Sequence, residues 1–128
     1  TLIAPADIAA EFAKRPKRKA GEWLLTQNWL TLDPATNTGA RLATWMKRHG
    51  WNAEPTMQLD SFDLISNLVA LGMGVSFVPI RALALHPNKR NVRRIALPDR
   101  FSRGLVVAMR RHRTVPAHLE QFVHSVLF

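Results

Sequence analysis

Short β-rich segments alternate with amphipathic helical segments along this chain, and that alternation constrains its fold more than any other feature. Strands are predicted at 29–32, 55–59 and 75–78, with helices at 40–49 and 62–71 between them. A helix that connects two strands of one sheet returns the chain to its starting edge, so the strands run in the same direction. We therefore expect an α/β fold with a mostly parallel sheet flanked by helices.

The same alternation extends toward both ends of the chain. A strand at 2–4 is followed by a helix at 6–13, which the basic run around Pro16 ends, and Trp23–Leu25 is expected to form one helical turn. The remaining predicted elements are a short helix at 80–85, strands at 92–97 and 105–109, and a final helix at 116–128.

The length and composition fit one packed domain or a piece of a larger protein. The chain has 128 residues, of which 47% are apolar and 21% charged, so it can form a core. It begins at Thr1 without an initiator Met, and we expect its first strand to have been cut from a longer chain. There is no cysteine, and no apolar run reaches the roughly 18–20 residues that span a bilayer. These features predict a cytoplasmic protein without a membrane partner.

Positive charge is concentrated in a few places. The formal net charge is +9, and the run from Lys14 to Lys19 holds five of the positive charges. Such a run is most often solvated charge in a loop or at the end of an element. Contact with nucleic acid or with an acidic protein surface is the alternative interpretation. No aromatic side chain interrupts the run, as it would in a protein that stacks single-stranded bases.

The sequence gives no sign of catalytic chemistry, a metal site or a cofactor. No two of the five histidines have the spacing of three or four residues that places two ligands on one helix face. Ser61 follows a strand, but no histidine is placed to activate it. Asp33 and Asp60 both follow strands and could form a carboxylate pair, yet helix capping explains residues in these places better.

The glycines at Gly72 and Gly74 predict a structural turn. A dinucleotide-binding loop runs from a strand through glycines into a helix, so that the helix N-terminus faces the phosphates. Here the glycines follow a helix and precede a strand, so the helix would present its negative end. We expect Gly72 to adopt a left-handed conformation at the helix end, and Gly74 to let the backbone turn into the sheet.

Several segments together resemble one known family, the LysR-type transcriptional regulators. The stretch Leu59–Phe62 has the cap and helix start of their effector-binding domain. Leu68–Val75 and Val78–Pro79 have its glycine turn and closing proline. The other matching segments, in the same order as in the family, are 2–5, 28–33, 103–110 and 116–128.

This resemblance implies a type 2 periplasmic-binding-protein-like fold, in which two α/β subdomains close on a small effector. Residues 1–98 would form the second subdomain, and 99–128 the return strand and C-terminal helix toward the first. The full regulator would bind DNA only through an N-terminal winged helix-turn-helix absent from this chain, and would form a homodimer or homotetramer. A solute-binding or transport-associated domain of the same fold class is the alternative, and an enzyme on a similar fold would lack catalytic residues.

The resemblance also implies which residues face the effector. They lie in the loop after one strand, in the cap pair before the next helix, and at the end of a third strand. Hydroxyl groups and helix-start amides suit a small anion, whereas the carboxylate of Asp33 counts against one. The candidate effector-binding residues are Asp33, Pro34, Thr36, Thr38, Asp60, Ser61, Val78 and Pro79.

Overall fold

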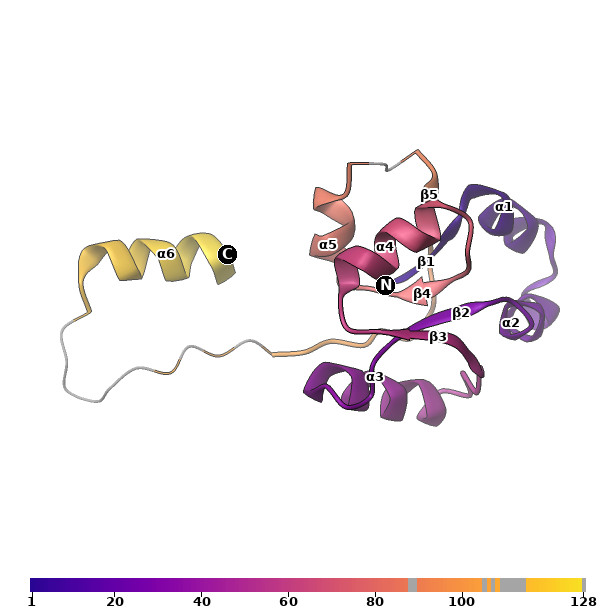
Figure 1. Ribbon diagram of the computed structural model, residues 1–128, viewed down its shortest axis with the longest axis horizontal. Helices are drawn as coiled ribbons and strands as arrows, with labels where there is room; N and C mark the ends of the chain where they lie inside the picture. The colour runs from indigo at the N-terminus through magenta and orange to yellow at the C-terminus, as the bar shows by residue number, and fades with distance from the viewer. Residues whose placement is uncertain (88–89, 105, 107, 109–114, 128) are drawn as a thin grey trace.

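A computed structural model describes residues 1–87, 90–104, 106, 108 and 115–127, within which strands and helices alternate (Figure 1). The strands are β1 (Leu2–Pro5), β2 (Trp29–Leu32), β3 (Pro55–Leu59), β4 (Ser76–Phe77) and β5 (Val92–Ile95). The helices are α1 (Ala6–Lys14), α2 (Lys17–Leu25), α3 (Asn37–Arg48), α4 (Phe62–Ala70), α5 (Ile80–Leu85) and α6 (Ala117–Leu127). The predicted strand at 105–109 falls largely on residues outside the described part.

The strands form one five-stranded surface made of two hydrogen-bonded sheets. One sheet has the order β4-β1-β5 and the other pairs β2 with β3. A parallel bridge between Trp29 and Val75 joins them, which gives the order β3-β2-β4-β1-β5. Four strands run in one direction, as predicted, but β1 is antiparallel to both of its neighbours. The expectation of parallel pairing is therefore wrong for β1, whose partners β4 and β5 both run in the opposite direction.

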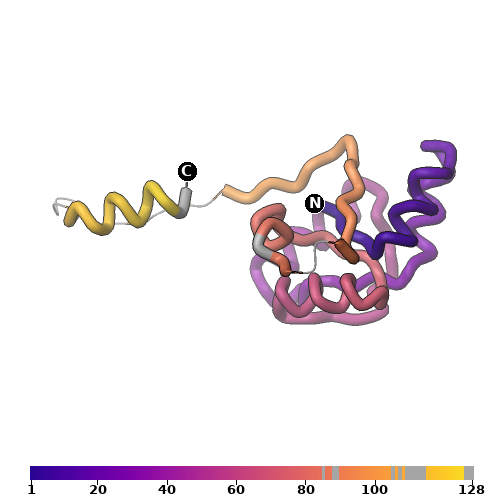
Figure 2. The backbone as a smooth tube through the Cα atoms, turned by 90° about the horizontal axis from the view of Figure 1, so that it is seen from above, coloured from indigo at the N-terminus to yellow at the C-terminus, as the bar shows by residue number. Residues whose placement is uncertain are grey.

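Alternating side chains of the strands serve two separate cores, one on each face of the sheet. In β1, Leu2 and Ala4 belong to one core and Ile3 to the other, as the twofold repeat of a strand requires. Helices α2 and α3 cover the first core with Leu24, Leu42 and Met46. Helix α4 covers the second core with Ile65 and Val69. The result is a layer of helices on each face of a central sheet, as the two views show (Figures 1 and 2).

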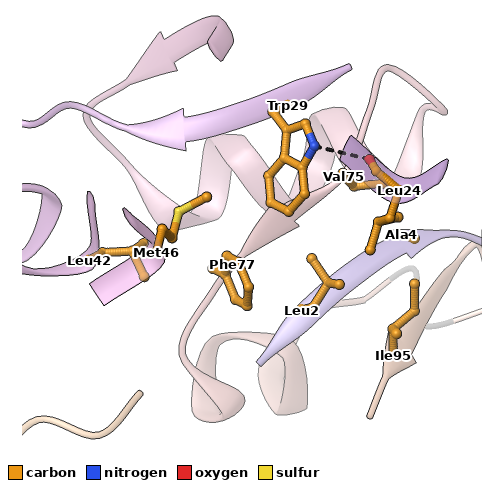
Figure 3. Packing of buried hydrophobic residues seen from close by; sticks show 9 residues of the cluster. All are labelled: Leu2, Ala4, Leu24, Trp29, Leu42, Met46, Val75, Phe77 and Ile95. Carbon is orange, nitrogen blue, oxygen red and sulfur yellow. Dashed lines mark hydrogen bonds between the residues drawn. The ribbon is translucent and has the colours of Figure 1, made fainter. Parts of the chain in front are cut away.

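Trp29 lies at the centre of the first core and joins α2 to the sheet. Its side chain is fully buried, and its indole Nε1 donates a hydrogen bond to the Leu24 carbonyl at 3.1 Å (Figure 3). The Phe77 ring lies 5.7 Å from the Trp29 ring, centroid to centroid. This hydrogen bond satisfies the one polar atom of the indole, so the ring can be buried without cost to that group.

The structure differs from the sequence-based expectation at α2. A nine-residue helix replaces the single expected turn, and it begins inside the basic run at Lys17. Gly21 has a low helix propensity, and three adjacent cations in the first turn face the positive end of the helix dipole, so this segment is a poor helix on local grounds. Burial of Ala20 and Leu24 against the core overrides those preferences.

Helix α6 lies apart from the α/β body in both views (Figures 1 and 2). Two of its large apolar side chains are open to solvent, Leu119 with 45% and Phe122 with 62% of its surface exposed. No helix within the described residues has the length and apolar character needed to cross a membrane.

Candidate functional site

The candidate effector-binding residues come together at one edge of the sheet, where β2, β3 and β4 end. The amide of Asp33, just after β2, donates to the Leu59 carbonyl at the end of β3 at 2.7 Å. At the end of β4, the Val78 amide donates to the Thr1 carbonyl at 2.9 Å. This is the carboxyl edge of the four strands that share a direction, where open α/β folds bind ligands.

The loop after β2 is held by its own side chains. The Asp33 carboxylate accepts a hydrogen bond from the Ala35 amide at 2.8 Å. The Thr36 hydroxyl donates to the Asp33 carbonyl at 2.7 Å and accepts from the Gly39 amide at 3.0 Å, and so caps α3. A Cβ atom on Gly39 would lie 2.0 Å from the Asp33 carbonyl oxygen. The Asp33 and Thr36 side chains therefore have structural partners in this loop.

Of the two residues Asp60 and Ser61 before α4, only Ser61 caps the helix. Ser61 is the N-cap, and its hydroxyl accepts from the Leu64 amide at 3.4 Å, a long contact. Asp60 is exposed to solvent. Helix α4 then ends before Gly72, which has a φ of 83°. Gly74 follows, where a Cβ atom would lie 2.4 Å from the Asn28 carbonyl oxygen, so a side chain there would collide with backbone.

A hollow of about 310 Å³ opens at this carboxyl edge. Three of the candidate residues line it: Thr38 from the first turn of α3, and Val78 and Pro79 after β4. Most of its wall is apolar, with three phenylalanines from different parts of the chain. The complete lining is Thr1, Thr38, Leu42, Phe62, Phe77, Val78, Pro79, Ile80, Arg81, Phe101 and Arg103.

Two arginines give the hollow its charge. The Arg103 guanidinium donates a hydrogen bond to the Thr38 hydroxyl, which joins the chain after β5 to the start of α3. Arg81, in α5, lines the same hollow. The hollow therefore combines an apolar wall with positive charge and a hydroxyl group.

The other candidate residues lie around this hollow without lining it. Asp33, Thr36, Asp60 and Ser61 are at the same edge, and Pro34 lines a different hollow of about 320 Å³ beside α3 and β3. Four further residues of the lining, Phe62, Arg81, Phe101 and Arg103, were not predicted from the sequence. Only Phe62 carried a local signal, because it directly follows the cap pair.

The described residues give no sign of a metal centre. No group of three or more histidine, aspartate or glutamate side chains comes together within the part of the chain that the structure describes. The polar side chains that line the hollow belong to two arginines and two threonines, and none of the lining residues has a carboxylate or imidazole side chain.

Comparison with known families gives one result. A family model described as the LysR substrate binding domain matches residues 2–127. Comparison with curated proteins and with solved structures gave no significant match. The matched range takes in both the α/β body and α6.

Proposed function

The chain belongs to the LysR substrate-binding domain family, and from that premise we propose that it senses a small anionic effector in the hollow at the carboxyl edge. The observation that carries this proposal is the lining of the hollow. Thr38 and Arg103 are hydrogen-bonded to each other at its rim, and Arg81 stands in the same lining. Family membership supports effector sensing in a transcriptional regulator, and the lining supports the class of ligand.

The lining favours an organic acid with an apolar body. Arg103 and Arg81 can each give paired N–H donors to a carboxylate, with a hydroxyl beside them at Thr38. Phe62, Phe77 and the other apolar side chains suit a hydrocarbon or aromatic portion. A volume of about 310 Å³ lies at the lower end of the usual range for small-molecule sites.

Asp33 no longer counts against an anion. Its carboxylate accepts from the Ala35 amide and is absent from the lining of the hollow. We propose that Asp33 and Thr36 shape the loop that presents Thr38, instead of touching the effector. Ser61 has the corresponding role at the start of α4, which presents Phe62.

We further propose how the signal leaves the site. Residues 1–98 act as the second subdomain of a type 2 periplasmic-binding-protein-like pair, and 99–128 lead back toward the first. An effector that contacts both subdomains favours one angle between them. In the full-length regulator, a homodimer or homotetramer, that angle changes the spacing of the subunits that hold DNA.

The test is a binding screen on the 128-residue chain. Small aliphatic and aromatic carboxylates are screened by thermal shift, and the hits are measured by calorimetry. Replacement of Arg103 by Gln is expected to weaken binding of a hit by about 10- to 100-fold, because a charge-assisted hydrogen bond contributes about 1.5–3 kcal/mol. Arg41→Gln is the matched control, because Arg41 is an exposed cation of α3 that does not line the hollow.

Equal losses in the two variants would mean that net charge alone attracts the ligand, and the proposed site would be wrong. Hits that are amines or uncharged sugars, with no carboxylate among them, would contradict the ligand class. Such a result would leave the family membership unaffected.

A further inference from the structure

Five cations form an exposed patch where α1 meets α2. We call Lys14, Arg15, Lys17, Arg18 and Lys19 the basic corner. All five side chains are exposed. The chain enters this region through β1, which runs against the other strands. Helix α1 therefore begins at the opposite edge of the sheet from the carboxyl ends of β2, β3 and β4 (Figure 1). The effector site does not account for these charges.

Most of this charge has no ion-pair partner among the residues that the structure describes. Lys14 alone forms an ion pair, with Glu11 at 2.8 Å, and the hydrogen bond from Lys14 lowers the pKa of Glu11. Among the described residues, no carboxylate pairs with the side chains of Lys17, Arg18 and Lys19. The Arg15 guanidinium lies over the Trp23 ring, 4.3 Å from its centroid. That stacking holds Arg15 against α2 and leaves the edges of its guanidinium open to an anion.

The arrangement carries an energetic cost within the folded chain. Lys17, Arg18 and Lys19 occupy the first turn of α2, which has no acidic residue and no side-chain cap. Cations at a helix N-terminus face the positive end of the helix dipole, where each is unfavourable. The three side chains spread over about 200° of the helix circumference, because successive residues turn by about 100°. A polyanion that covers this arc relieves both the mutual repulsion and the dipole conflict.

We propose that the basic corner binds the phosphate backbone of duplex DNA without reading its sequence. The choice of DNA among polyanions rests on the proposed function, because a regulator that holds DNA keeps this domain tethered near it. Tethering raises the effective concentration, so even a weak contact is populated. The proposal departs from the expectation that DNA is bound only through the winged helix-turn-helix, which would keep the sequence-specific contacts.

The surroundings of the basic corner favour DNA over a membrane. A helix that lies on a bilayer directs large apolar side chains outward, between its cations. In α2 the buried residues are Ala20 and Leu24, which point into the core. Trp23 is half-buried beneath Arg15. The outward surface of α2's first turn is therefore purely cationic, as a phosphate-binding surface requires.

The experiment measures binding of the 128-residue chain to a duplex of arbitrary sequence by fluorescence anisotropy, from about 50 to about 200 mM salt. The test variant combines Lys17→Gln, Arg18→Gln and Lys19→Gln. The control combines Arg41→Gln, Lys47→Gln and Arg48→Gln, three exposed cations of α3. Both sets remove three charges from a net charge of +9. Circular dichroism checks that each variant is folded.

The test variant should bind the duplex at least about tenfold more weakly at the lowest salt. The magnitude of its slope of log affinity against log salt should fall by about 3, because each lost phosphate contact removes about 0.9 from the slope. The control should keep most of the affinity. If the combined variant is unfolded, the single replacements are used, and each should lower the slope by about 1.

Equal losses in both variants, or no binding of the unaltered chain to the duplex, would overturn the proposal. Vesicles with about one-third phosphatidylserine, and polyglutamate, are measured beside the duplex at equal anionic charge. The proposal would also be overturned if the chain bound the vesicles or polyglutamate more tightly than the duplex and the test variant lost that binding. The basic corner would then be assigned to a membrane or to an acidic protein. Carboxylate binding at the hollow is measured separately, so failure here leaves the proposed effector site standing.

Discussion

At the level of single residues, the backbone of Gly74 lies very close to the backbone of Asn28. The chain can enter β4 at this point only because glycine has no side chain. The Val75 amide donates to the Asn28 carbonyl at 2.8 Å, and the Leu30 amide donates to the Val75 carbonyl at 3.0 Å. These two hydrogen bonds join the β2–β3 pair to the rest of the sheet. A Cβ atom at Gly74 would lie 2.4 Å from the same Asn28 oxygen, so it would push the two segments apart.

Replacement of Gly74 by Ala is expected to lower the free energy of unfolding by about 1–3 kcal/mol, because the added methyl group meets backbone that cannot rotate away. Urea denaturation measures the change. Gly104→Ala is the control, since no atom lies within 4 Å of the position its Cβ would take. The control should stay within about 0.5 kcal/mol of the unaltered chain. A neutral Gly74→Ala would mean that the β2–β4 contact is looser than described.

At the level of elements, the start of α3 is the best-defined helix end at the candidate site. Thr36 both donates to the Asp33 carbonyl and accepts from the Gly39 amide. These bonds fix the direction in which α3 leaves the sheet, and so the position of Thr38 at the hollow. A change in this cap should affect both stability and effector binding.

Replacement of Thr36 by Ala is expected to cost about 1–2 kcal/mol of stability, because it removes the cap and leaves an amide without its partner. Thr44→Ala, in the same helix, is the control. The Thr44 hydroxyl donates to the Ala40 carbonyl within an exposed turn, and Ala is the better helix former, so that change should be neutral or stabilising by up to about 0.5 kcal/mol. Thermal unfolding of the two variants side by side checks the difference, and equal destabilisation would contradict the capping role of Thr36.

Local pattern predicted the elements that have regular apolar spacing and clear ends. Helix α4 between Ser61 and Gly72 is an example, and so is β2. The same reasoning missed most of α2, because its helix depends on the burial of Ala20 and Leu24 by residues distant in sequence. It also missed the reversed direction of β1, since strand direction is set by partners more than seventy positions away. Local signals carry no information about either effect.

Some residues that line the hollow were candidates from the sequence, and others were not. Thr38, Val78 and Pro79 were candidates through the family resemblance, and they do line the hollow. Arg81, Phe101 and Arg103 were not predicted. Arg103 reaches Thr38 across 65 positions of sequence, and such a contact depends on the path of the chain after β5. Whether any of these residues binds the effector stays a prediction.

At the level of the whole molecule, α6 contributes little to the α/β body as described. Its backbone hydrogen bonds outside the helix return to Pro116, at its own N-terminus. Leu119 and Phe122 expose large apolar surfaces, and Figure 2 shows the helix well separated from the sheet. Among the described residues, neither core of the body includes a side chain of α6.

Removal of residues 105–128 is therefore expected to leave the free energy of unfolding of the α/β body within about 0.5 kcal/mol. Binding of an apolar fluorescent dye should fall, because the exposed side chains of Leu119 and Phe122 are lost. Urea denaturation and dye titration measure the two effects. Loss of more than about 2 kcal/mol would show that α6 packs against the body in solution, contrary to this expectation.

The central position of β1 has a consequence for the order of events during synthesis. Leu2 pairs with Phe77 on one side and with Ile95 on the other. At about 5–20 residues per second, roughly 5–20 s separate translation of β1 from that of β5. During that interval the nascent chain holds an apolar strand with two open edges outside the ribosome. The central strand β1 is thus translated before both of its partners, and it gains its second partner only when β5 has been synthesised. Until then its unpaired edges are available for binding by chaperones.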